Sequence, residues 1–129
     1  MPENLSFEYA TIRVVPRVER EEFINAGVVV FCLARKQLLC RILIEDERLR
    51  TLWPEIDLNI VSEHLDAITR VCKGDPEAGP IARLSARERF HWLVSPRSTM
   101  IQVSPVHSGL CTSPEEALAE IFERVIGSP

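Results

Sequence analysis

Residues 28–44 read VVVFCLARKQLLCRILI, two apolar runs joined by a short polar connection. The first run, residues 28–33, is rich in β-branched residues and too short for a typical helix, so it predicts a buried strand. The second run, residues 38–44, predicts a neighbouring strand, with residues 34–37 as the turn. The segment therefore predicts an antiparallel β-hairpin. Asn25, Ala26 and Gly27 have the composition of a tight turn just before it.

A third strand is expected upstream of the hairpin. Residues 7–15, FEYATIRVV, combine aromatic and β-branched residues in partial alternation. Arg13 interrupts one face of this strand, and a buried guanidinium is costly unless it is paired. Arg13 therefore either pairs with an acid such as Glu21 or Glu22, or contributes a cation to a binding site.

The sequence changes to a helical period after the hairpin. Asp46 can cap a short helix that Pro54 ends, because the proline ring blocks continuation. A longer helix is expected over residues 59–73, with Gly74 as its C-terminal cap. The apolar stripe of this helix consists of Val61, Leu65, Ile68 and Cys72.

Two capping boxes predict two further helices. Ser85 and Ser113 are each followed by a glutamate three residues later, which is typical of a helix N-terminus. The predicted helices cover residues 86–94 and 114–126, and residues 100–103 between them predict a last strand. We expect Trp53 and Trp92 in the core.

The order of strands and helices predicts an α+β fold. We expect a single domain over residues 1–129, with a small antiparallel or mixed sheet of about four strands covered by helices on one face. No apolar run approaches the roughly 18 residues that a membrane helix needs. The expected compartment is therefore the cytoplasm. The net charge of −4 argues against nonspecific nucleic-acid binding.

The four cysteines show none of the close pairs that zinc sites need. Cys32, Cys40, Cys72 and Cys111 are separated by 8, 32 and 39 positions, so we expect no metal and no cofactor. A hairpin centred on Lys36 would place Cys32 opposite Cys40. In a reducing cytoplasm this pair would remain two thiols.

The polar stretch SPRSTMIQVSPVHSGL, residues 95–110, is the strongest candidate for a site. An arginine fork at Arg97, flanked by hydroxyls such as Ser98 and by Gln102, can hold a phosphate or carboxylate. The alternative is structural: Ser95 and Ser98 cap turns, and Arg97 pairs with a surface acid.

His107 is the candidate acid or base, because its unperturbed pKa of about 6.5 suits proton transfer near neutral pH. It can equally be a hydrogen-bonded structural residue. A nucleic-acid interface would rest only on Arg83, Arg87, Arg89 and Arg97.

The chain resembles the bacterial DUF3037 family, a family without an assigned function. The resemblance is carried by EFINAGVVVFC at residues 22–32, by the polar stretch at residues 95–110 and by the flanking strand and helix. The resemblance singles out Arg13, Asn25, Gly27, Pro96, Arg97, Ser98, Gln102, Pro105, His107 and Gly109. Members resemble small bacterial proteins that are sometimes encoded beside HipA-like kinases, and the resemblance therefore implies a partner or accessory role.

Two functions follow as hypotheses. The first is a noncatalytic accessory or interaction module, a partner of a HipA-like kinase, with a small-anion site. Its expected ligand-binding residues are Arg13, Asn25, Arg97, Ser98 and Gln102. The second is a small hydrolase or phosphoryl-transfer enzyme that uses His107 with Arg97 and Arg13. An exposed sheet edge would also allow a homodimer.

Overall fold

The computed structural model describes residues 4–97 and 99–127, in which five strands form one antiparallel sheet. The sheet runs β3-β2-β1-β4, and β5 also pairs with β1. The fold is therefore α+β, as the element order predicts. The strands are β1 (Leu5–Val14), β2 (Ile24–Cys32), β3 (Gln37–Ile42), β4 (Ile101–Val103) and β5 (His107–Cys111).

Four α-helices accompany the sheet in the described residues: α1 (Asp46–Leu52), α2 (Leu58–Lys73), α3 (Ala86–Leu93) and α4 (Pro114–Val125). The predicted caps of α3 and α4 are confirmed, because Ser85 and Ser113 accept the backbone N–H of Glu88 and Glu116. Asp46 is not a cap; it is the first helical residue of α1.

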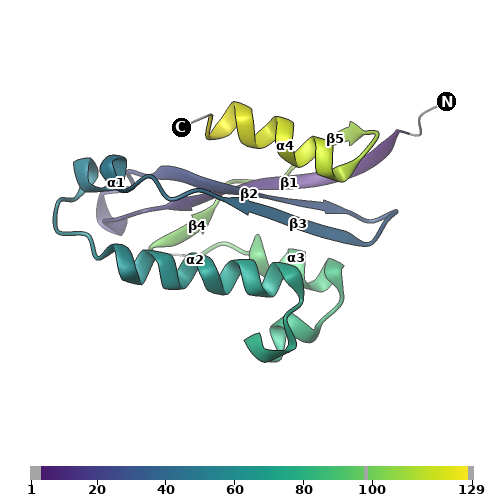
Figure 1. Ribbon diagram of the computed structural model, residues 1–129, viewed down its shortest axis with the longest axis horizontal. Helices are drawn as coiled ribbons and strands as arrows, with labels where there is room; N and C mark the ends of the chain where they lie inside the picture. Colours follow the sequence, from purple (N-terminus) through teal and green to yellow (C-terminus); the bar gives the residue numbers. More distant parts are fainter. Residues whose placement is uncertain (1–3, 98, 128–129) are drawn as a thin grey trace.

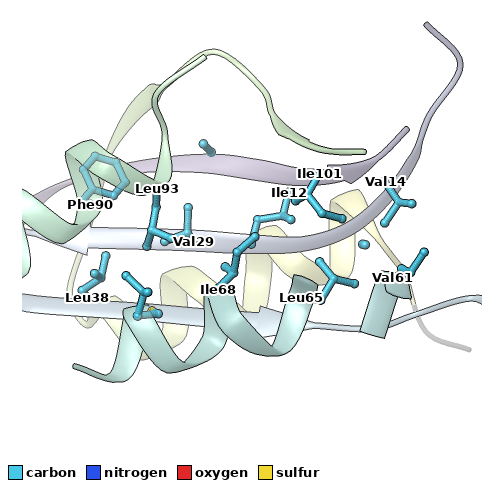
Figure 2. Close-up of a cluster of buried hydrophobic side chains, with 14 of the residues drawn as sticks. Ile12, Val14, Val29, Leu38, Val61, Leu65, Ile68, Phe90, Leu93 and Ile101 are labelled. Atoms are coloured by element: carbon cyan, nitrogen blue, oxygen red, sulfur yellow. The ribbon is translucent and has the colours of Figure 1, made fainter. Parts of the chain in front are cut away.

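The helices cover both faces of the sheet, so the expectation of one covered face is wrong. Figure 1 shows α2 and α3 on one side and α4 on the other. The larger core lies under α2, whose predicted stripe is buried against the sheet (Figure 2). The smaller core lies under α4 and contains Leu5, Phe7, Val28, Val30, Cys32, Ala117, Ile121 and Phe122. Alternate residues of β1 and β2 thus serve different cores.

The hairpin forms where it is predicted, but in a different register. Cys32 pairs with Gln37 and Cys40 with Val29, so Cys32 and Cys40 do not face each other. The connection ends at Lys36, whose φ of 52° is left-handed. Cys40 instead hydrogen-bonds with Cys72 of α2, and this contact lowers the pKa of the Cys40 thiol and raises that of Cys72.

The predicted tight turn at residues 25–27 is also wrong, because β2 continues through it. The register changes from Ile12↔Gly27 to Arg13↔Asn25, which leaves Ala26 as the extra residue of a β-bulge. Glycine is required at position 27 by close packing: a Cβ there would lie 2.7 Å from the carbonyl oxygen of Arg41.

Ser104 bridges the gap between β4 and β5. Its backbone N–H donates to the Thr11 oxygen at 2.9 Å, and its hydroxyl oxygen accepts the Thr11 N–H at 2.8 Å. The Ser104 hydroxyl thus accepts the hydrogen bond that a backbone carbonyl of a neighbouring strand would otherwise accept. The next residue, Pro105, has no backbone N–H and cannot donate to the sheet. Strand β5 was not predicted, since its sequence HSGLC lies at the sheet edge and lacks buried alternation.

We expect Ser104→Ala to lower the free energy of unfolding by about 1–3 kcal/mol, because the buried Thr11 N–H loses its acceptor. Chemical denaturation measures this loss. Ser108→Ala, on the exposed part of the same edge, is the matched control and should stay within about 0.5 kcal/mol of the parent. Equal stability of the two variants would contradict this role of Ser104.

Candidate functional site

Three of the predicted ligand-binding residues lie side by side across three strands. Arg13 of β1 pairs with Asn25 of β2 on one side and with Gln102 of β4 on the other. We call these three residues the Arg13 row. They are separated by up to 89 positions in the chain, and the antiparallel registers alone bring them together.

The Arg13 row lies on the face of the sheet opposite to α2. The neighbours Ile12 and Val14 belong to the core under α2, so alternation directs Arg13 to the other face. The bulge at Ala26 gives Asn25 the same orientation. The three side chains of the row are half-buried.

Arg13 has an aromatic partner and no carboxylate partner within the described residues. Its guanidinium carbon lies 4.2 Å from the centre of the Phe23 ring, a cation–π contact. The expected acid Glu22 is instead paired with Arg20, at 2.9 Å. No salt bridge in the described residues joins Arg13 to Glu21 or Glu22, so the structural alternative in which one of them neutralises Arg13 is wrong.

Two polar atoms of the Arg13 row are buried without a hydrogen-bond partner. They are Nε of Arg13 and Oδ1 of Asn25. Gln102, by contrast, is held in place, because its Nε2 donates to the Thr99 carbonyl oxygen at 2.9 Å. Unpaired buried polar groups are uncommon and each costs about 1–3 kcal/mol, so this pair marks the row as a candidate site.

Arg97 lies in a different environment, on the α2 side of the sheet. Its Nη2 donates to the Trp92 carbonyl oxygen at 2.7 Å, and its guanidinium carbon lies 4.2 Å from the Trp92 ring centre. Trp92 is 38% exposed and is therefore not the core residue that we expected. Ser98, the neighbouring predicted ligand, lies outside the described residues.

His107 lies against neither of these arginines. It is exposed at the start of β5, opposite Tyr9, and the two rings are 5.3 Å apart. Arg13 is four residues further along β1 than Tyr9, a span of roughly 13 Å at strand spacing. Each of the three predicted site residues contacts a different aromatic residue: His107 contacts Tyr9, Arg13 contacts Phe23 and Arg97 contacts Trp92.

The predicted basic region is largely structural. Arg89 donates through Nη1 to the carbonyl oxygens of Val71 and Cys72, at 3.0 and 2.6 Å, and so caps the C-terminus of α2. Arg83 donates to the Pro76 carbonyl oxygen at 3.3 Å. These contacts hold the loop between α2 and α3. Arg83 and Arg89, two of the four arginines of the predicted basic region, are therefore engaged in structural hydrogen bonds.

Within the described ranges, no group of three or more His, Cys, Asp or Glu side chains could hold a metal ion. Nor does any helix there combine the length and apolar character needed to cross a membrane.

A family model described as a protein of unknown function, DUF3037, matches residues 9–126. The chain belongs to the DUF3037 family. No curated protein and no solved structure shows a significant match to it. The matched region of this DUF3037 chain includes the Arg13 row, Arg97 and His107.

Packing explains one further position that the DUF3037 resemblance singled out. A Cβ on Gly109 would lie 2.8 Å from Cζ of Phe7, so the absence of a side chain makes room for the Phe7 ring. Sequence reasoning missed Phe23 and Trp92 as partners of the two arginines. The available signal was that each aromatic residue lies within ten positions of its arginine.

We expect Arg89→Ala in this DUF3037 chain to lower the free energy of unfolding by about 1–3 kcal/mol, because two α2 carbonyls lose a charged donor. Arg87→Ala, an exposed position on the same helix, serves as the control with a change below about 0.5 kcal/mol. Thermal and chemical denaturation measure both. An Arg89→Ala variant as stable as the parent would contradict the capping role of Arg89.

Proposed function

We propose that this protein is a noncatalytic accessory module that binds an anionic group through the Arg13 row. The observation that carries the proposal is the state of Arg13: a half-buried cation that meets no carboxylate within the described residues. A carboxylate or phosphate is the natural partner of such a guanidinium, because charge-assisted hydrogen bonds are the strongest available to it.

The neighbours of Arg13 suit this role. Phe23 supports the guanidinium through its ring and leaves the N–H groups free for an anion. Asn25 carries an acceptor and two donors, so a half-turn of its amide would present N–H groups to an anion held by Arg13. The buried Nε–H of Arg13, which has no partner in the described residues, would then gain an acceptor, a free-energy gain that ligand binding can supply.

The alternative of a hydrolase or phosphoryl-transfer enzyme has less support. A general acid or base must reach its proton directly or through one water. His107 contacts Tyr9, whereas Arg13 contacts Phe23 and Arg97 contacts Trp92. We therefore favour recognition over catalysis.

We further propose that the module acts in the cytoplasm of bacteria with a protein partner, and a HipA-like kinase is the first partner to test. The four cysteines form no disulfide bonds, which suits a reducing compartment. An acidic side chain or a phosphorylated residue of the partner would supply the anion. Copurification from the native host tests this part. Recovery of the protein only as a partner-free species would count against it.

The anion site itself is tested by titration with inorganic phosphate and with acetate, followed through the NMR signal of the Arg13 Nε–H. We expect a saturable shift in the parent and an affinity at least about tenfold weaker in Arg13→Gln, because a charged hydrogen bond is lost. The free energy of unfolding should fall by less than about 1 kcal/mol in this variant, because it loses only the cation–π contact with Phe23 and no ion pair.

Arg17→Gln is the matched control, because Arg17 is an exposed arginine already paired with Glu19 at 2.8 Å. This variant should bind both anions as the parent does. Two results would contradict the proposal: unchanged anion binding in Arg13→Gln, or a loss of more than about 2 kcal/mol of unfolding free energy, which would make Arg13 a structural residue.

A further inference from the structure

A cavity of about 300 Å³ lies on the α2 side of the sheet, separate from the Arg13 row. It is bounded by α2, by the segment between α2 and α3, by the end of α3 and by the approach to β4. Its wall is mainly apolar, and its polar groups are concentrated at a few positions. The lining residues include Ala67, Ile68, Arg70, Ile81, Arg97 and Met100.

Arg97 is held at this cavity by two contacts. The Trp92 carbonyl oxygen accepts one N–H of Arg97, and the Trp92 ring stacks on its guanidinium. A side chain fixed in this way loses little conformational entropy when it binds a ligand. The remaining N–H groups of the fork are therefore preorganised donors.

The charge of Arg97 is not balanced by a carboxylate in the described part of the chain. Arg70, the other arginine of the cavity, is already paired with Asp75 at 2.9 Å. Burial lowers the pKa of the Arg97 guanidinium, because partial removal from water disfavours its charged form. A bound anion would offset this cost.

We propose that the cavity binds a small organic anion that joins a carboxylate to an apolar body. The carboxylate would accept hydrogen bonds from Arg97, and the body would contact the apolar wall formed by Ile68, Ile81 and Met100. A volume of 300 Å³ lies at the lower end of the range for ligand sites, so the ligand is small. This site is additional to the anion site of the Arg13 row and uses different elements.

Three simple compounds separate the two parts of the predicted ligand. Phenylacetate has both the carboxylate and an apolar ring, phenylacetamide keeps the ring without the charge, and acetate keeps the charge without the ring. The indole N–H signal of Trp92 in an NMR titration reports binding at this cavity. We expect phenylacetate to bind at least about tenfold more tightly than either of the other two.

Two variants test the two parts of the site separately, one by removing the charge of Arg97 and the other by filling the cavity. Arg97→Gln should weaken phenylacetate about tenfold and leave phenylacetamide nearly unchanged, because only the charged contact is lost. Ala67→Phe, at an exposed position of α2, should fill the cavity and block both ring compounds without touching Arg97. The control Arg87→Gln, on α3 outside the cavity, should bind phenylacetate as the parent does. Thermal unfolding checks that each variant is folded.

Three results would overturn the proposal. Equal binding of phenylacetate and phenylacetamide would overturn the role of the charge, and equal binding of acetate would overturn the role of the cavity. No saturable shift of Trp92 would overturn the site altogether. Because Arg13→Gln should leave phenylacetate binding at the cavity intact, as measured by the Trp92 signal, failure of this site is distinguishable from failure of the site at the Arg13 row.

Discussion

The structure depends on the central strand β1, which is hydrogen-bonded along both of its edges. One edge pairs with β2, and the other is shared by β4 and β5. Helices cover both faces of the sheet (Figure 1), and β1 contributes to the core on each face. Leu5 and Phe7 lie in the core under α4, whereas Ile12 and Val14 lie in the core under α2. The polar side chains of β1 differ in exposure: Ser6 and Glu8 are exposed, whereas Arg13 is half-buried and has no carboxylate partner in the described residues.

The bulge at Ala26 determines the side-chain pattern at the start of β2. Without an extra residue, regular alternation would turn Ile24 toward the α4 face and Asn25 toward the core. With it, Ile24 is buried in the core under α2 and Asn25 lies beside Arg13. One inserted residue thus determines which side chains meet the arginine.

Local patterns predicted most of the helices and strands, because caps and periodicity are local properties. The helix starts at Ser85 and Ser113 and the buried stripe of α2 needed only nearby residues. Three features depended on distant packing and were not predictable in the same way: the hairpin register, the bulge and the edge strand β5. The Asn-Ala-Gly segment was misread because a turn and a bulge favour similar residues.

The candidate site was predictable as a set of residue types and not as an arrangement. Arg13, Asn25 and Gln102 were singled out in the sequence, but their grouping follows from registers fixed by the whole sheet. Arg97 came from the same polar stretch as Gln102, yet the two side chains lie on different sides of the sheet: Gln102 of β4 joins Arg13 on one face, and Arg97 lines the cavity on the other. Neighbours in sequence therefore serve opposite surfaces.

The break between β4 and β5 also affects how this protein meets other copies of itself. A long, continuous outer strand would offer a row of open backbone groups to any extended chain in a crowded cell. Here Ser104 turns its hydroxyl inward and Pro105 lacks an amide hydrogen, so the outer border is divided into segments of three and five residues. The interruption at Ser104 and Pro105 thus completes the hydrogen bonding of β1 and also disfavours strand-to-strand aggregation along this edge of the sheet.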